Sequence, residues 1–123
     1  MDAKITFPGG LQVNAEYGPF TIVTNQDGTA PAPFTLFLAS LGTCAGIYAL
    51  SFCKQRGLNS EGLEILQRTT SDPETHMITE VALEIKLPED FPEKYRSAIV
   101  RAVDQCAVKK HLLQPPKFSI TTR

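Results

Sequence analysis

The sequence has no surplus of basic residues, which is the charge signature that proteins binding nucleic acids usually carry. Twelve Lys and Arg residues are balanced by thirteen Asp and Glu residues, so the formal net charge is −1. The hydrophobic fraction of 42% and the charged fraction of 20% are those of a folded domain rather than a disordered chain. We therefore expect a globular protein with no nucleic-acid partner.

Charge is also scarce along the amino-terminal part of the chain. Residues 1–53 carry one basic and three acidic residues, whereas residues 54–123 carry eleven basic and ten acidic residues. The charged residues of the first part are Asp2, Lys4, Glu16 and Asp27. So few charges indicate extensive burial, and we expect part of this surface to lie against a second copy of the chain.

Targeting and disulfide signals are missing as well. Met1–Gly10 has neither a basic start nor a long apolar run, so we expect no secretory leader. Three cysteines are an odd number, and no Cys-x-x-Cys motif occurs. His76 stands alone, and Cys106 with His111 offers a single possible ligand pair, so no metal site is expected. The sequence therefore predicts a cytoplasmic protein whose thiols are reduced at rest.

Short segments with alternating apolar residues, bounded by turn residues, predict strands in three parts of the chain. They are Lys4–Phe7, Leu11–Ala15 and Phe20–Thr24, then Leu63–Thr69 and Met77–Leu87, and finally Phe118–Thr122. Pro8-Gly9-Gly10 and Ser71-Asp72-Pro73 are the turn signals between paired strands. In Met77–Leu87 the alternation predicts one face toward the core and one toward solvent.

Phe34–Cys53 is a run of twenty residues without a charge. Its length alone would allow a membrane-spanning helix. Polar and small residues dilute its apolar content, however, and amphipathic strands precede and follow it, so we expect no membrane span. Gly42 and Gly46, one turn apart, would allow another helix to approach closely, and Gly57 provides a carboxy-terminal cap. The segment predicts a buried central helix.

A second helix is predicted after Pro88. Asp90 and Glu93 form a possible capping box, with Pro92 in the first turn. One face of this helix is apolar within an arc of about 80°, at about 100° per residue. That face consists of Phe91, Tyr95, Ile99, Ala102 and Cys106. Strands, long helix, strands, helix and strand together predict a single α+β domain over residues 1–123.

The three cysteines differ in their surroundings, although each could be a small buried hydrophobe. Cys53 follows Cys44 by about 900° of rotation and about 13.5 Å of rise along one helix. The two thiols would then point to opposite faces, beyond disulfide reach, and we interpret Cys53 as structural. Cys44 lies between small residues in Gly42–Gly46, which leave space for a substrate or a second thiol. Cys106 falls on the buried stripe of the second helix.

Gly42–Gly46 also spells the nucleophile-elbow pattern with cysteine in place of serine. That pattern requires a strand directly before it and a large parallel sheet around it. Here the preceding residues belong to the predicted helix, and neither His76 nor His111 follows at a suitable place for a catalytic triad. A cysteine hydrolase is therefore the weaker alternative.

Two segments around the cysteines carry a family resemblance. Pro33–Cys44 resembles the proline-led start of the central helix in the OsmC/Ohr family, where that helix reaches the peroxidatic cysteine. Ala102–Val108 is similar to the family segment that holds the resolving cysteine, although Ala107 stands where proline is common. Both segments occur in the family's order, and the resemblance covers most of the chain. The family comprises bacterial hydroperoxide-reducing and stress-induced proteins.

The resemblance implies an intertwined homodimer with the long helices packed at its centre. It also implies that Cys44 attacks a hydroperoxide and that Cys106 condenses with the resulting sulfenic acid to a disulfide. A cellular dithiol would then reduce the disulfide, and neither a cofactor nor a metal would be needed. The function it predicts is a thiol-dependent hydroperoxide reductase.

Two departures place the chain in an OsmC-like branch without the usual charged residues. The family's peroxidases have a glutamate directly after the first proline of the helix, where this chain has Phe34. They also use an arginine from the amino-terminal strands, and this chain has no arginine before Arg56. Cys44 lies about ten residues inside its helix, too far for the helix's own amino terminus to ionise it. Lys109, Lys110 or the partner chain would have to activate it; the alternative is a redox-sensing or small-ligand-binding protein without catalysis.

Overall fold

The chain has the predicted α+β organisation, with antiparallel strands first, then a long helix, a second strand pair and short helices. The computed structural model describes all residues from 1 to 123. They form two compact units, Met1–Ala39 and Ser40–Arg123. The single domain over residues 1–123 stays a prediction.

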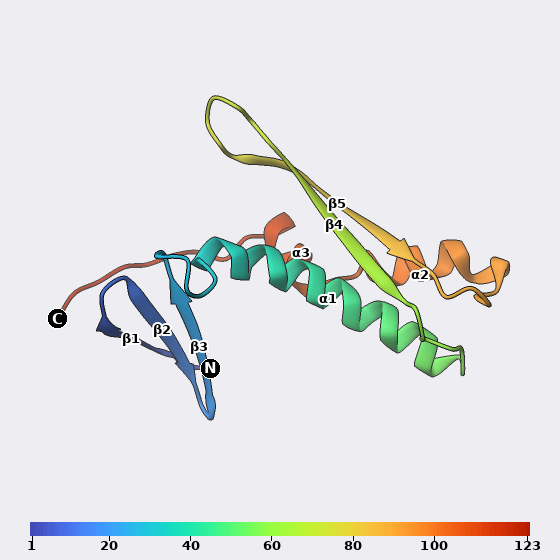
Figure 1. Cartoon of the computed structure of the whole chain (residues 1–123), viewed down its shortest axis with the longest axis horizontal. Coiled ribbons are helices and arrows are strands. Elements are labelled where there is room, and N and C mark those ends of the chain that lie inside the picture. Colours follow the sequence, from blue (N-terminus) through green and yellow to red (C-terminus); the bar gives the residue numbers. More distant parts are fainter. The chain divides into compact units, whose positions relative to one another are not determined.

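The amino-terminal unit contains a three-stranded antiparallel sheet, drawn in blue in Figure 1. Its strands follow one another in the order β1 (Lys4–Gly9), β2 (Gln12–Tyr17) and β3 (Phe20–Asn25). Gly10, at φ +57°, provides the left-handed residue that the tight turn between β1 and β2 requires. The predicted hairpin and the predicted third strand are confirmed.

The long helix α1 runs from Pro33 to Gln55 and confirms the helix expected over the uncharged run. Its end is a Schellman motif centred on Gly57, which has φ +63°. The N–H of Leu58 donates to the carbonyl of Cys53 at 2.9 Å, and that of Gly57 donates to Lys54 at 3.3 Å. These two bonds satisfy carbonyl groups that the helix end would otherwise leave unpaired.

The sequence predicted a buried central helix, and within the protomer the burial of α1 is one-sided. Its buried residues are Leu41, Ala45, Ala49, Phe52 and Cys53. Ile47, on another face, is 54% exposed. By length and apolar composition α1 could cross a membrane, but core helices of soluble proteins pass the same test. The face of α1 around Ile47 is thus an apolar surface that the protomer does not cover.

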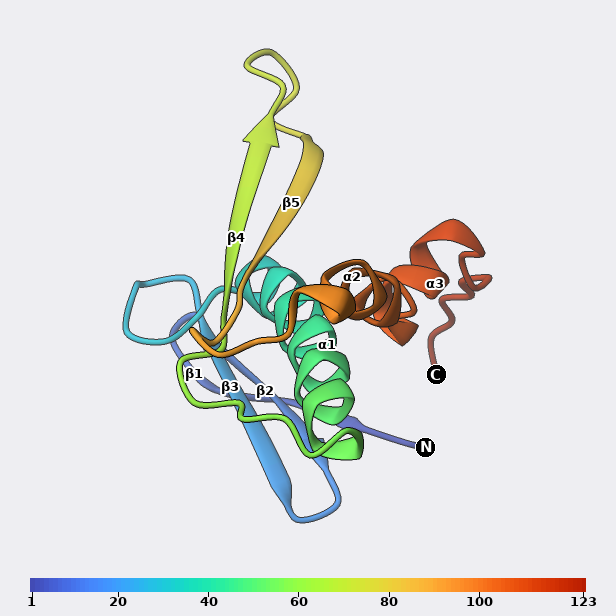
Figure 2. The ribbon, with the colours of Figure 1, turned by 90° about the vertical axis from the view of Figure 1, so that its right-hand side faces the viewer.

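The second unit begins its sheet with a hairpin of β4 (Glu64–Ser71) and β5 (Ile78–Lys86). The alternation predicted for the second strand is confirmed, because Leu83 and its same-face neighbours are half-buried while Ala82 and the other intervening residues are exposed. Asp72 organises the turn by accepting hydrogen bonds from the next residues. Figures 1 and 2 both show the turn end of this hairpin standing clear of the helices of its own unit.

The carboxy-terminal helical region differs from the single helix that the sequence predicted. It consists of a 3₁₀ turn η1 (Glu93–Tyr95), then α2 (Arg96–Val103) and α3 (Ala107–Leu113). The predicted capping box is wrong, since Pro92 precedes the first turn and no side chain caps it. Cys106 has φ −49° and ψ 124°, which is not helical, and it is the residue directly before α3.

The core of the second unit lies where α1 meets α2 and the inner face of the hairpin. Ile99 of α2 and Cys53 of α1 are fully buried there. The ring of Phe52 meets that of Tyr95 edge-on with centroids 5.9 Å apart. The Arg56 guanidinium lies 3.7 Å from the centre of the Phe52 ring and 5.7 Å from that of Tyr95. This packing fixes the middle and end of α1 against α2.

The predicted final strand, Phe118–Thr122, does not form. Residues 115–123 adopt neither helix nor strand, and the side chains of Phe118 and Ile120 are 87% and 94% exposed. A strand needs a neighbouring strand edge to accept its hydrogen bonds, and in this unit β4 and β5 pair with each other alone. The segment keeps its strand-like sequence without a partner.

Candidate functional site

The structure brings together the two cysteines that the resemblance singled out. Cys44 is half-buried in α1, and Cys106 is 3% exposed at the junction between α2 and α3. The Cys106 side chain makes a hydrogen bond to the Cys44 sulfur. Both cysteines are free. Its two sulfur atoms belong to one unit, since both residues follow Ser40.

The Cys44 sulfur is surrounded by hydrogen-bond donors. The bond from the Cys106 side chain is the main reason why the pKa of the Cys44 thiol is lowered. The amide N–H of Val108 and, to a smaller extent, that of Ala107 lower the pKa further, while burial opposes them. Donors to a thiolate favour the charged form in the same way as donors to a carboxylate. Cys44 is therefore the sulfur that ionises more readily.

Cys106 is shifted in the opposite direction. Burial is the main reason why its pKa is raised, and the bond to Cys44, together with the charge there, raises it further. The amide N–H groups of Lys109 and Val108 act the other way but do not outweigh burial. The pair is thus polarised, with a thiolate favoured on Cys44 and a protonated thiol on Cys106.

The source of this polarisation differs from what the sequence suggested. Of the three activators that the sequence left open (Lys109, Lys110 or the partner chain), Lys109 forms an ion pair with Asp104. His111 Nδ1 lies 2.6 Å from the carbonyl oxygen of Ala107. The donors come from the main chain at the start of α3. No sequence pattern separates α3 from the preceding helix, so none predicts these donors.

Cys53 is not part of the site. It is fully buried in the core against Ile99, and burial raises the pKa of its thiol. A thiol kept protonated in apolar surroundings is a poor nucleophile. This agrees with its interpretation as a structural residue.

A cavity of about 570 Å³ has Cys106 in its wall, while Cys44 is not among its lining residues. The inner face of β5 and one face of α2 provide most of its apolar lining. These apolar residues are Leu41, Val81, Leu83, Ile85, Leu87, Ile99, Val100, Val103 and Leu112. Arg96, Arg101, Asp104 and Lys109 add charged groups to the lining. The volume and lining suit a small, mainly apolar molecule.

Comparison with known families shows to which family the chain belongs. Residues 26–121 match the family model described as OsmC-like protein. The chain belongs to the OsmC-like family. Comparison with curated proteins yields no match.

Solved structures support the OsmC-like fold. One neighbour is a Psychrobacter arcticus protein described as induced by osmotic stress and involved in the detoxification response; it has a TM-score of 0.73 and 19% identity, covering 88% of this chain and 85% of its own. The OsmC-like protein of Mycoplasma pneumoniae reaches 0.72 at 13% identity, covering 93% and 87%. The organic hydroperoxide resistance protein OhrB of Bacillus subtilis reaches 0.54 at 17% identity, covering 90% of each chain. At these identities the likeness establishes the fold.

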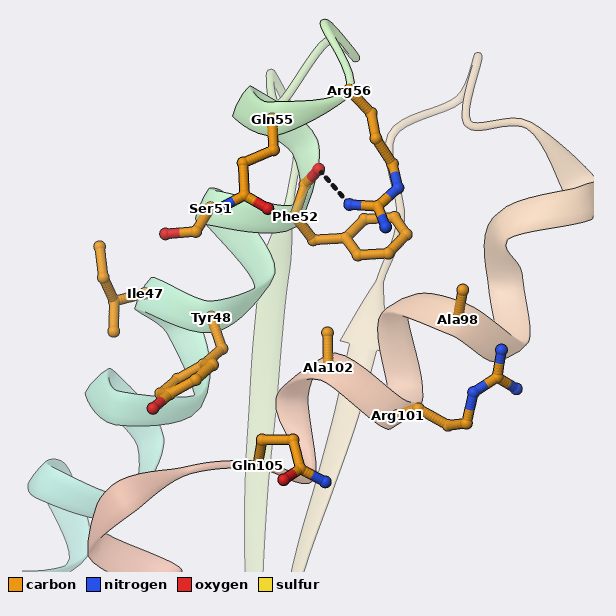
Figure 3. A pocket seen from close by; sticks show the side chains of 10 residues that line it. All are labelled: Ile47, Tyr48, Ser51, Phe52, Gln55, Arg56, Ala98, Arg101, Ala102 and Gln105. Carbon is orange, nitrogen blue, oxygen red and sulfur yellow. Dashed lines mark hydrogen bonds between the residues drawn. The ribbon is translucent and has the colours of Figure 1, made fainter.

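A second groove in this OsmC-like chain lies between α1 and α2 and contains no cysteine (Figure 3). Its volume is about 780 Å³. Ile47 and Tyr48 line it from α1, and Ala98 and Ala102 from α2. At its end Arg56 lies over the Phe52 ring and donates to the Phe52 carbonyl at 3.4 Å. The groove continues the face of α1 that the protomer leaves open.

The OsmC-like chain has no group of three or more His, Cys, Asp or Glu side chains placed to hold a metal ion. His76 is exposed in the hairpin turn and has a left-handed backbone at φ +61°. His111 follows the site but contacts the Ala107 carbonyl rather than a sulfur. The chemistry offered by the site is that of its two thiols.

Proposed function

We propose that this OsmC-like protein is a thiol-dependent hydroperoxide reductase. Cys44 is the peroxidatic cysteine and Cys106 is the resolving cysteine. The observation that carries the proposal is the hydrogen bond between two thiols whose pKa values are shifted apart, down at Cys44 and up at Cys106. The reaction needs a thiolate at the attacking cysteine and a protonated thiol at the resolving cysteine, and the opposite pKa shifts favour these two states.

The reaction has two chemical steps. The Cys44 thiolate attacks the outer oxygen of a hydroperoxide, the O–O bond breaks, and Cys44 becomes a sulfenic acid while an alcohol is released. Cys106 then attacks the Cys44 sulfur and the sulfenic oxygen leaves as water, which creates a disulfide. A cellular dithiol reduces that disulfide and returns both thiols.

Main-chain donors support this activity without the arginine and glutamate of the family's peroxidases. The amide N–H groups of Val108 and Ala107 lower the pKa of Cys44, as a neighbouring cation would. They are the first two residues of α3, which follow a junction held by the bond from the N–H of Cys106 to the carbonyl of Val103 at 3.2 Å. Fixed donors of this kind stabilise negative charge without reorganising.

The apolar cavity beside Cys106 supports an organic rather than an inorganic hydroperoxide as substrate. The name of the OhrB neighbour, an organic hydroperoxide resistance protein, points the same way. The proposed setting is the cytoplasm, where dithiol reductants keep such thiols reduced. No cofactor or metal takes part in the proposed cycle.

The proposed assembly of the protein is a homodimer. The open face of α1 around Ile47, the unhindered Gly46 and the unpaired Phe118–Thr122 segment support it. Apolar surface of this kind usually belongs to an interface. Sedimentation equilibrium should give twice the chain mass of 13.5 kDa. A monomer at micromolar concentration would contradict this part of the proposal.

The peroxidase proposal is tested by adding one equivalent of cumene hydroperoxide to the reduced protein. Thiol titration should fall from the three free cysteines to Cys53 alone, and peptide mapping should find a Cys44–Cys106 disulfide. Cys106→Ser should stop at a sulfenic acid that dimedone traps, and Cys44→Ser should not react. Three thiols remaining in the wild-type protein would refute the proposal.

The cavity also favours a second candidate function, namely a redox-sensing or small-ligand-binding protein without turnover. That function predicts a ligand retained through purification and oxidation that stays slow and incomplete. Native mass spectrometry of freshly purified protein distinguishes the two. A native mass that shows protein alone, without a retained ligand, together with rapid, stoichiometric disulfide formation would remove this candidate.

A further inference from the structure

The departing oxygen in the first step needs a proton. When the Cys44 thiolate attacks the outer oxygen of a hydroperoxide, the inner oxygen leaves as an alkoxide, which is a far stronger base than a thiolate. A positioned proton donor accelerates such a step by about 10²-fold or more. The family's charged side chains that could assist are absent here, because Phe34 replaces the glutamate and no arginine precedes Arg56.

We propose that the Cys106 thiol donates its proton to the alkoxide that leaves in the first step, before it acts as the resolving nucleophile. This inference rests on the proposed peroxidase function and gives Cys106 a second role in it. Cys106 is thus a proton donor first and a nucleophile second.

The position of Cys106 supports this role. Its side chain is hydrogen-bonded to the attacking sulfur and at the same time forms part of the cavity wall. The organic group of a hydroperoxide held in that cavity would bring the departing oxygen toward Cys106. Its 3% exposure keeps bulk water from competing for the task.

The neighbouring groups are less suited to give a proton. Lys109 is engaged in its ion pair with Asp104, and His111 Nδ1 contacts the Ala107 carbonyl. The amide N–H group of Val108 near Cys44 can stabilise negative charge, but an amide does not release its proton at neutral pH. The raised pKa of Cys106 means that this thiol still holds its proton when Cys44 has lost its own.

The atoms and charges of the sequence balance. Cys44–S⁻ and ROOH give Cys44–SOH and RO⁻; RO⁻ takes the proton of Cys106–SH and leaves as ROH. Cys106–S⁻ attacks the Cys44 sulfur, and the departing hydroxide takes a proton from solvent to become water. The hydroperoxide is reduced by two electrons and the two thiols are oxidised to one disulfide. Proton transfer therefore creates the resolving thiolate at the moment when the sulfenic acid appears.

The test compares Cys106→Ser with Cys106→Ala, since serine keeps an O–H donor and alanine does not. Two rates are measured at Cys44 under single-turnover conditions: sulfenic acid formation with cumene hydroperoxide and alkylation by iodoacetamide. Both reactions need the thiolate, but the leaving iodide needs no proton. The ratio of the two rates therefore isolates proton donation from any change in the pKa of Cys44.

We expect Cys106→Ala to lower this ratio by about 10²-fold relative to wild type, and Cys106→Ser to lower it by clearly less. A ratio in Cys106→Ala equal to that of wild type would overturn the proton-donor role while leaving the peroxidase function intact. If wild type itself forms neither sulfenic acid nor disulfide, the peroxidase function fails and the inference with it. Circular dichroism and the iodoacetamide rate establish that each variant is folded around Cys44.

Discussion

Lys109 is ion-paired with Asp104 across the junction between α2 and α3. The residues between them include Ala107 and Val108, whose amide N–H groups face Cys44. Both charged side chains are partly exposed, so the pair contributes little to stability. Because the ion pair spans the junction, it can restrain the positions of these two amide donors.

Asp104→Asn and Lys109→Met should each raise the pKa of Cys44, because the amide donors lose part of their restraint. Below that pKa, the rate of Cys44 alkylation should fall by about threefold, the size of effect expected for one exposed ion pair. The measurement is the pH profile of iodoacetamide alkylation, with Lys110→Met as the matched control. If the two charges acted only through their fields, Asp104→Asn would lower the pKa of Cys44 instead.

The stability of the protein should depend on pH through Cys44. Its pKa is lowered in the folded protein by the bond from Cys106, whereas the thiol of the unfolded chain has a pKa of about 8.5. The resulting stabilisation is present above the unfolded pKa and is lost as pH falls through the folded pKa. The unfolding free-energy difference between wild type and Cys44→Ala should thus increase as pH rises toward about 8.5. Urea titrations over this range measure it, and a flat or decreasing difference would contradict the shift.

Ile99 should be a major contributor to stability. It is fully buried against α1, so Ile99→Ala should lower the unfolding free energy by about 3 kcal/mol through lost burial and a new cavity. The adjacent Val100 is 57% exposed, and Val100→Ala should change stability by about 0.5 kcal/mol or less. Urea denaturation of both variants tests this contrast, and equal effects would show that α2 does not pack as described.

The cavity beside Cys106 should select among hydroperoxides. Val81→Phe places a larger side chain in its lining, so it should slow cumene hydroperoxide by about tenfold relative to hydrogen peroxide. Ala82→Phe is the matched control, because Ala82 lies on the exposed face of the same strand. Single-turnover rates with the two oxidants give the comparison. An unchanged ratio in Val81→Phe would place the substrate elsewhere.

Much of this fold follows from sequence patterns that depend on nearby residues. Alternation predicts the strands of both sheets, and Gly57 marks the end of α1 because only its left-handed backbone closes the helix cap. The separation of Cys53 from Cys44 follows from helix rotation and rise alone. These features need no knowledge of a distant partner.

Other features depend on contacts that the local pattern does not encode. The helix break at Cys106 occurs without Gly or Pro, so no local pattern predicts α3 or the amide groups at its start that face Cys44. Phe118–Thr122 has the composition of a strand but lacks an edge to pair with in its own unit. Charged side chains near Cys44 can be predicted from a residue pattern, whereas main-chain donors cannot.

Cys53 carries a consequence of its own, because it lies fully buried among the side chains of the core. A water-borne disulfide reagent can reach it only when that core transiently opens. When the other two thiols are blocked, the labelling rate of Cys53 therefore measures how often the core opens in the native state. Cys53 can therefore measure the frequency of local opening of the core without any added probe residue.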